Sequence, residues 1–315
     1  MKIVFMGTPD FAAASLRKLI DEGYEIPLVV TQPDRRGNRN KMVLSPVKEL
    51  ALENGLEVAQ PHKIKGDEDV ISKLKAIGPD MIVVAAFGQI LPKEVLEIPR
   101  LGCVNVHGSL LPQFRGASPM QSAILEGLDE TGVTIMRMDE GLDTGDMISK
   151  VKVDIRGTDI IEVSQMLAES GADLLAITIP SIADGTAAYK PQSDDEATYS
   201  HLIRKSDGFT DFKESAEQIE RKIRAYADWP SCYTYIDGGL QLKLYKAEAI
   251  PGEDSAYAPG TVSATDKHSY TISCKEGSLK ILEQQLQGKK RMSAGDFMRG
   301  HKLSAGDRFG AEEGI

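Results

Sequence analysis

An asparagine and a histidine stand two residues apart in the apolar run "CVNVHG", after which the chain bends through Gly108 and Pro112. Side chains alternate between the two faces of a strand, so Asn105 and His107 project to one side and the intervening valines to the other. An imidazole can carry protons near neutral pH, and an amide can donate to an oxyanion without changing its charge. The spacing therefore predicts a proton-transfer site at the end of a strand. A histidine satisfied by backbone groups gives the same pattern, so the pair alone leaves both interpretations open.

A catalytic imidazole needs a carboxylate that orients it, and the Gly-rich loop "MDEGLDTGDM" offers three: Asp139, Asp143 and Asp146. We favour Asp143, because Gly141 and Gly145 on either side let the loop approach a ligand closely. An acidic turn between two strands explains the loop equally well from spacing alone.

The elements that must position these side chains alternate along the first half of the chain. Short apolar runs are separated by amphipathic stretches: "KIVFMG", "DFAAASLRKLIDEG", "IPLVVTQ", "SPVKELALENG", "DMIVVAAFG" and "LGCVNVHG", followed by "TGVTIMRMD" and "MISKVKVDI". Strands buried on both faces and alternating with helices predict an α/β fold with a Rossmann-like, doubly wound, mostly parallel sheet. Pro46 and Pro119 stand where a first helical turn tolerates proline. In such a sheet the ligand crevice lies at the carboxyl ends of the strands, where Asn105 and His107 are expected.

The second half has a different organisation. A long amphipathic helix is predicted within 158–185, and it completes a catalytic domain over residues 1–189. The polar stretch 190–206 has no clear period and is predicted to be a linker. Residues 207–315 contain closely spaced short strands, with a hairpin signal at Asp237-Gly238-Gly239, and predict an OB-like antiparallel β-barrel.

Length and composition further limit the kinds of protein to which the chain can belong. A chain of 315 residues favours two domains, and its net charge of −10 opposes a strongly cationic nucleic-acid binder. Residues 207–315 are close to charge balance, so any RNA contact must be local. The opening apolar run is short and interrupted by Gly7 and Pro9, and no later segment approaches a membrane span, so we expect a cytoplasmic protein without a membrane partner. Three widely spaced cysteines, Cys103, Cys232 and Cys274, are expected to be small buried residues.

Two common chemistries are disfavoured. The first turn, "MGTPDF", has only Gly7 where a dinucleotide fingerprint needs three glycines, and Pro9 and Asp10 remove an amide and add a negative charge there. Ser109 beside His107 does not predict a serine hydrolase, because the chain around it lacks the G-x-S-x-G elbow.

The run "NVHGSLLPQFRGASP", with "FGQILP" before it and "DEGLDTGD" behind it, resembles the folate-dependent formyltransferases. The resemblance implies a catalytic set of Asn105, His107 and Asp143, with 10-formyltetrahydrofolate as formyl donor and no metal. It also implies two folate-binding stretches: Ser109, Leu110, Leu111 and Pro112, together with Phe87, Gly88, Gln89, Ile90 and Leu91.

Within that family, the chain is similar over almost its whole length to the members that formylate initiator methionyl-tRNA. The start "MKIVFMGTPDFA", the loop "TQPDRRGNRNKMVLSPVK" and the C-terminal "SAGDFMRG" carry this similarity. It implies an initiator Met-tRNA partner, a role in translation initiation, a monomer, and tRNA contacts by Arg39, Arg36 and Lys41. Lys289, Lys290 and Arg291 offer a local phosphate contact in the second domain. The family usually has Arg and Trp where Gln113 and Phe114 stand, and often a basic residue at Ser122; these departures affect RNA contacts and leave the Asn, His, Asp set unchanged.

Three alternatives remain open. Other formyl transferases act on a purine ribonucleotide or an amino sugar with the same motif, but the purine enzyme typically has no second domain. A formate-releasing hydrolase would use water in the same pocket and usually carries an N-terminal regulatory domain. A noncatalytic RNA-binding protein would leave Asn105, His107 and Asp143 without a role.

Overall fold

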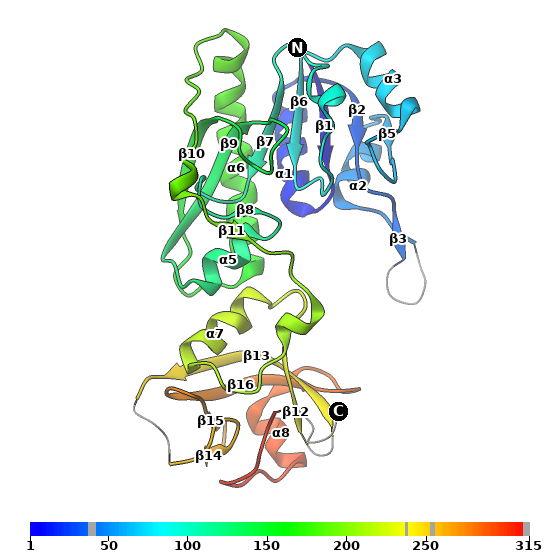
Figure 1. Cartoon of the computed structure of the whole chain (residues 1–315). Coiled ribbons are helices and arrows are strands. Elements are labelled where there is room, and N and C mark those ends of the chain that lie inside the picture. Colours follow the sequence, from blue (N-terminus) through cyan, green and yellow to red (C-terminus); the bar gives the residue numbers. More distant parts are fainter. Residues whose placement is uncertain (37–41, 237–238, 253–255, 311–315) are drawn as a thin grey trace. The chain divides into compact units, whose positions relative to one another are not determined.

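The computed structural model describes residues 1–36, 42–236, 239–252 and 256–310. They form two compact units (Figure 1). Unit 1 comprises Met1–Met120, Asp129–Ile155 and Glu162–His201, and unit 2 comprises Gln121–Leu128, Arg156–Ile161 and Leu202–Ile315.

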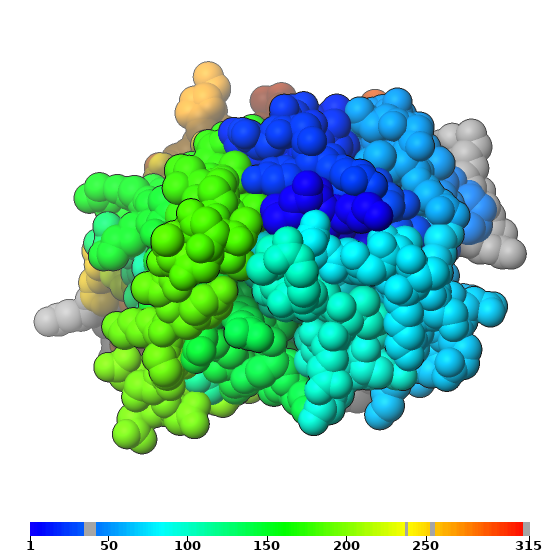
Figure 2. All heavy atoms as spheres, turned by 90° about the horizontal axis from the view of Figure 1, so that it is seen from above, coloured from blue at the N-terminus to red at the C-terminus, as the bar shows by residue number. Residues whose placement is uncertain are grey.

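A seven-stranded sheet organises unit 1, in the order β10-β9-β7-β6-β1-β2-β5. Its strands are β1 (Lys2–Gly7), β2 (Glu25–Val30), β5 (Val58–Ala59), β6 (Met81–Ala85), β7 (Cys103–His107), β9 (Glu130–Arg137) and β10 (Met147–Asp154). The strands from β5 to β7 are parallel, whereas β9 runs antiparallel to both β7 and β10. Figure 2 looks onto the end of unit 1 where β1 begins, with the blue start of the chain packed against cyan and green segments. The predicted doubly wound, mostly parallel sheet is confirmed.

Helices cover both faces of this sheet: α1 (Asp10–Asp21), α2 (Pro46–Glu53), α3 (Glu68–Ile77), α4 (Lys93–Leu96) and α6 (Ile160–Ala183). Helix α5 (Pro119–Leu125) begins in unit 1, and its residues from Gln121 onward belong to unit 2. Two start signals act as predicted. Ser45 caps α2 by accepting from the Lys48 N–H, with Pro46 at the first helical position, and α5 begins at Pro119. Gly7 serves packing, because a Cβ there would lie 2.7 Å from that of Ala12 in α1.

Helix α6 runs along the β7, β9 and β10 side of the sheet (Figure 1). At Gly171 the helix lies so close to the sheet that an added Cβ would be 3.1 Å from a methyl group of Val106 in β7 and 3.2 Å from one of Val133 in β9. The expectation that no segment approaches a membrane span is wrong, since α6 is long and apolar enough to cross one by length and composition. In this fold Leu167 and Leu175 of α6 are fully buried, whereas Ile161 and Ile177 are exposed, so one face of the helix packs inside the protein.

Two-residue strands complete the unit. β3 (Arg35–Arg36) pairs with β4 (Met42–Val43), and β8 (Arg115–Gly116) pairs in parallel with β11 (Tyr199–Ser200). The predicted linker therefore begins with ordered contacts inside unit 1, where Lys190 also exchanges backbone hydrogen bonds with Met147. The domain limits at 189 and 207 stay predictions.

Unit 2 is built on a six-stranded antiparallel sheet in the order β12-β13-β16-β15-β14, with β17 on β16. Its strands are β12 (Cys232–Ile236), β13 (Leu240–Ile250), β14 (Val262–Thr265), β15 (Tyr270–Ser273), β16 (Ser278–Leu286) and β17 (Met292–Ser293), and its principal helices are α7 (Ala216–Ala225) and α8 (Ala294–Gly300). Helix α7 starts with a capping box, in which Ser215 and Gln218 satisfy each other's backbone N–H groups. Asp237 and Gly238 of the predicted hairpin lie outside the described residues, but the strands on either side pair antiparallel.

The three cysteines are free and buried, as expected. Burial raises the pKa of Cys103, Cys232 and Cys274 to about 12, since a thiolate would lose its hydration. They are therefore poor nucleophiles and act as core residues.

Candidate active site

Asn105 and His107 lie at the carboxyl end of β7, between β6 and β9. Both side chains are buried, at 8% and 5% exposure. Val106 faces the opposite way, toward α6, as the strand alternation predicts. The sheet order reverses around β1, with β2 on one side and β6 on the other, so the pair stands beside the expected crevice.

The ring of His107 is fixed by a backbone group. Its Nε2 lies 3.0 Å from the carbonyl oxygen of Phe114, which can only accept, so Nε2 carries a hydrogen. Nδ1 is the ring nitrogen that faces the carboxylate, 3.8 Å from Oδ2 of Asp143.

Asp143 connects the two other residues. Its Oδ2 accepts a 2.9 Å bond from the backbone N–H of Gly116, and its Oδ1 accepts a 3.5 Å bond from the Asn105 amide. The side chain is 16% exposed. The structure thus brings together the three residues predicted to be catalytic. Asp139 instead accepts from Gly141 and Thr144 within its own loop.

The two glycines beside Asp143 allow close approach, but to the protein rather than to a ligand. A Cβ on Gly145 would lie 1.9 Å from the carbonyl oxygen of Arg137, and one on Gly141 would lie 2.0 Å from Oγ1 of Thr144. Asp143 itself has φ of +55°, in the left-handed region that side chains other than Gly enter at a cost. The loop is therefore folded tightly against the end of β9.

The turn after β7, predicted to bind folate, is held by internal bonds. Ser109 is fully buried, and its hydroxyl donates to the carbonyl of Gln113 at 2.6 Å, while its own carbonyl accepts from Thr134. Leu111 is also fully buried and packs on two methionines, Met136 and Met147. The hydroxyl of Ser109 and the side chain of Leu111 thus stabilise the conformation of this turn through contacts within the protein.

The second predicted folate stretch presents a different surface. Phe87 and Leu91 belong to the core of unit 1, whereas Ile90 is 75% exposed and Gly88 is exposed with φ of +76°. Gln89 accepts from the N–H of Ile64 at 2.7 Å and so ties the stretch to the segment before α3. Backbone groups and Ile90 are therefore its accessible parts.

Comparison with known proteins decides the family. A formyl transferase family model matches residues 1–178, and a model of the formyl transferase C-terminal domain matches residues 202–302. The methionyl-tRNA formyltransferase of Lachnospira eligens is 45% identical over 317 residues, covering 98% of this chain and all of the relative. That of Bacillus subtilis strain 168 is 45% identical over 312 residues, covering 98% of each. The chain belongs to the formyl transferase family.

Solved structures share the fold of this formyl transferase. A sugar 3N-formyl transferase, solved in the presence of dTDP and 5-N-formyl-THF, superposes with a TM-score of 0.64 at 21% identity, covering 92% of this chain and 99% of the other. The methionyl-tRNA formyltransferase of Clostridium thermocellum gives a TM-score of 0.55 at 21% identity, covering 79% and 93%.

Two of the predicted tRNA-binding residues of this formyl transferase, Arg39 and Lys41, lie outside the described residues, and Arg36 is placed in β3. The base of their loop is anchored at Asp34, whose carboxylate accepts from Lys48 at 2.6 Å and from Gln60 at 2.8 Å. The bond from Lys48, with that from Gln60, lowers the pKa of Asp34 below its usual value. The loop thus starts from a fixed point.

Sequence reasoning missed the groups that hold the side chains predicted to be catalytic in this formyl transferase. The carbonyl of Phe114 and the N–H of Gly116 are backbone groups, for which side-chain types give no signal. Gln192, which binds the Asp143 loop, lies in the stretch predicted to be a linker. A single polar residue in the polar run "KPQSDDE" (residues 190–196) gives no signal by which the sequence could have identified Gln192.

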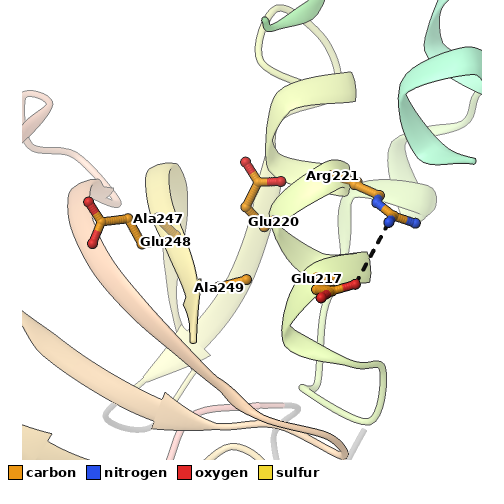
Figure 3. A pocket seen from close by; sticks show the side chains of 6 residues that line it. All are labelled: Glu217, Glu220, Arg221, Ala247, Glu248 and Ala249. Atoms are coloured by element: carbon orange, nitrogen blue, oxygen red, sulfur yellow. Dashed lines mark ion pairs between the residues drawn. The ribbon is translucent and has the colours of Figure 1, made fainter. Parts of the chain in front are cut away.

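A pocket of the formyl transferase lies between α7 and β13 in unit 2 (Figure 3). It is lined by Glu217, Glu220, Arg221, Ala247, Glu248 and Ala249. Each of its carboxylates is ion-paired, with Arg221, Arg224 or Lys280, so no charge is left to bind a ligand strongly. Within the described part of the chain, no group of three or more His, Cys, Asp or Glu side chains is placed to hold a metal ion.

Proposed function

We propose that this formyl transferase moves the formyl group of 10-formyltetrahydrofolate to the α-amino group of methionine on initiator methionyl-tRNA, in support of translation initiation. The observation that carries the proposal is the meeting of Asn105, His107 and Asp143 at the carboxyl end of β7, in a chain 45% identical over its length to methionyl-tRNA formyltransferases.

The reaction needs a neutral amine and a stabilised oxyanion. A free α-amino group has a pKa of roughly 8, so a nearby proton acceptor suffices to make it nucleophilic. Its nitrogen attacks the formyl carbon, and the carbonyl oxygen becomes negative. The Asn105 amide and a protonated Nδ1 of His107 donate to that oxygen.

Collapse of the intermediate breaks the bond between the formyl carbon and the folate nitrogen. That nitrogen takes a proton as it leaves, and the attacking nitrogen loses one, so the proton count is balanced. With Nε2 of His107 held by Phe114, Nδ1 is the atom that exchanges the proton. Asp143 orients the imidazole and accepts protons through water.

The folate co-substrate is bound along Gly88 to Ile90 and the turn from Ser109 to Pro112. The exposed Ile90 supplies an apolar contact, and the exposed backbone at Gly88 supplies hydrogen-bonding groups. Phe87 and Leu91 act from the core, by supporting this stretch.

Binding of tRNA is assigned to the loop that carries Arg36, Arg39 and Lys41, and to a second domain over residues 207–315 behind a linker over 190–206. The protein works in the cytoplasm as a monomer and uses no membrane. A chain with a net charge of −10 needs such local cationic contacts to hold RNA.

Transfer of labelled formyl from 10-formyltetrahydrofolate tests the proposal, with initiator Met-tRNA, elongator Met-tRNA and a purine ribonucleotide as acceptors. We expect product on the initiator tRNA alone. Product on another acceptor would keep the catalytic set and overturn the substrate, and no transfer to any acceptor would favour an RNA-binding protein without this activity.

A further inference from the structure

The side chain of Gln192 is attached to the loop that carries Asp143. Its Nε2 donates two hydrogen bonds, to the carbonyl oxygens of Asp143 and Gly145, each 2.8 Å long. Both hydrogens of the amide are thus used on a single loop. Gln192 comes nine residues after the end of α6, so a distant part of the chain fixes the backbone at Asp143.

Asp143 needs such support because of its backbone. With φ of +55°, it occupies a conformation that costs a residue other than glycine free energy and persists only where neighbours enforce it. The direction of the carboxylate toward His107 follows from that backbone angle. Bonds to the carbonyls of residues 143 and 145 hold the peptide groups that follow Asp143 and Gly145, and with them this direction.

The other end of the Gln192 amide is anchored as well. Its Oε1 accepts a 3.0 Å bond from Nε of Arg115, a residue only 1% exposed. Nη1 of Arg115 donates to Asp194 at 2.9 Å and to the hydroxyl of Tyr199 at 3.3 Å. A buried guanidinium with several acceptors has little freedom, so Gln192 is held in turn.

Arg115 also stands between the two backbone groups that contact the catalytic side chains. The preceding carbonyl, of Phe114, accepts from His107, and the following N–H, of Gly116, donates to Asp143. The backbone N–H of Arg115 donates to the carbonyl of Thr198. The segment 192–199 therefore holds both the histidine side and the aspartate side of the site.

We infer that Gln192 is a positioning residue for formyl transfer, which acts through Asp143 and is anchored by Arg115. This inference rests on the proposed function, since it takes Asp143 to be a catalytic residue. Gln192 touches neither substrate in this account; it sets the geometry of a group that does.

The test is a double-mutant cycle between Gln192→Glu and Asp143→Asn, read as kcat and KM in the formyl-transfer assay. Gln192→Glu keeps the side chain's size and its contact with Arg115, but replaces the donor to two carbonyls by an acceptor. We expect it to lower kcat by about 10²-fold with little change in either KM, because a small misplacement of a reacting group has this effect. In the Asp143→Asn background the same change should cost almost nothing further.

Gln165→Glu is the matched control. Gln165 lies on the exposed side of α6, and its amide donates to the side chain of Glu169 on the same helix. It should leave kcat unchanged. If Gln192→Glu does not fold at the assay temperature, Gln192→Met enters the same cycle, as it removes both donors without adding charge.

The outcomes separate the two claims. Equal losses from the Gln192 substitution in both backgrounds would overturn the positioning role, because the residue would then act independently of Asp143. Full activity of Asp143→Asn alone would overturn the catalytic role of Asp143 in the proposed function. Loss of kcat that disappears in the Asp143→Asn background supports both.

Discussion

Backbone groups fix the proposed catalytic side chains of this enzyme as much as the side chains fix one another. Phe114 holds one ring nitrogen of His107, and Gly116 holds one oxygen of Asp143. Neither bond depends on the third residue, Asn105. Substitutions within the set should therefore remove a chemical group without moving the remaining ones, which makes single-residue kinetics informative.

His107→Ala removes the only ring that can exchange a proton beside Asn105 in the described site. We expect kcat to fall by about 10²- to 10⁴-fold, the usual contribution of general acid–base catalysis, while the protein still folds. Turnover of Met-tRNA measures the fall in kcat, and circular dichroism checks that the variant still folds. His62→Ala, at an exposed histidine, is the control and should keep full turnover. Full activity of His107→Ala would show that His107 takes no part in catalysis.

Asn105, His107 and Asp143, the proposed catalytic residues, show which features of the site side-chain types and spacing can predict and which they cannot. The alternation of a strand was enough to put Asn105 and His107 on one face, and a Gly-rich acidic loop indicated Asp143. The supporting contacts come from backbone groups and from Gln192, 49 residues along the chain from Asp143. Such contacts exist only once the chain is folded, so side-chain spacing could not predict them.

At the scale of elements, the loop between β9 and β10 depends on Gly145. A methyl group there would lie 1.9 Å from the carbonyl oxygen of Arg137, a backbone atom that cannot swing away. We expect Gly145→Ala to displace the Asp143 loop and lower kcat by about 10-fold or more, with a loss of stability of about 1–3 kcal/mol. Thermal unfolding measures the loss of stability, and steady-state kinetics measure the fall in kcat. Gly252→Ala, where nothing lies within 4 Å of the new Cβ, is the matched control; equal behaviour of the two variants would contradict the argument.

The turn between β14 and β15 gives a pH-dependent prediction. Asp266 accepts from the hydroxyl of Ser269, and from the N–H groups of His268 and Ser269, and these bonds lower its pKa to about 2. Since the pKa in the unfolded chain is higher, roughly 3.9, the carboxylate stabilises the fold fully above that value. This contribution is lost as the pH falls from about 4 through 2.

Asp266→Ala should therefore be less stable than the wild type at pH 5, and the difference should shrink toward pH 2. Urea unfolding followed by the fluorescence of Trp229, the single tryptophan, reports on unit 2. Glu276→Ala, at an exposed carboxylate of the same unit, serves for comparison. A difference from the wild type that does not change with pH would rule out the Asp266 carboxylate as its source.

Elements with a strong period were predictable, and those without one were not. β6 is a continuous apolar run, and β7 alternates its valines with Asn105 and His107. The two-residue strands β8 and β11 have no period to detect, so the sequence did not predict the pairing of Tyr199–Ser200 with Arg115–Gly116. Long-range contacts of Arg115, Gln192 and Lys190 add to this pairing.

At the scale of the whole molecule, the negative net charge of the protein opposes the binding of RNA, which is also negatively charged. A net charge of −10 repels a polyanion at long range, and salt weakens that repulsion as well as any local attraction. In the run from 289 to 291, Arg291 is already engaged, since it pairs with Glu283 and its guanidinium lies 4.6 Å from the ring centre of Tyr245. Lys289 and Lys290 are exposed and remain the better candidates for phosphate contacts.

The salt dependence of tRNA binding tests this assignment. Each cation that neutralises a phosphate releases condensed counterions, so removing it flattens the plot of log affinity against log salt by about one unit. Lys289→Ala with Lys290→Ala should therefore raise KM for Met-tRNA at low salt and lower the slope by about 1–2, with kcat retained. The matched pair Lys63→Ala with Lys65→Ala makes the same change in net charge at exposed lysines of unit 1. If both pairs alter the slope equally, net charge governs binding; if only the first does, the contact is local, as an acidic RNA-binding enzyme requires.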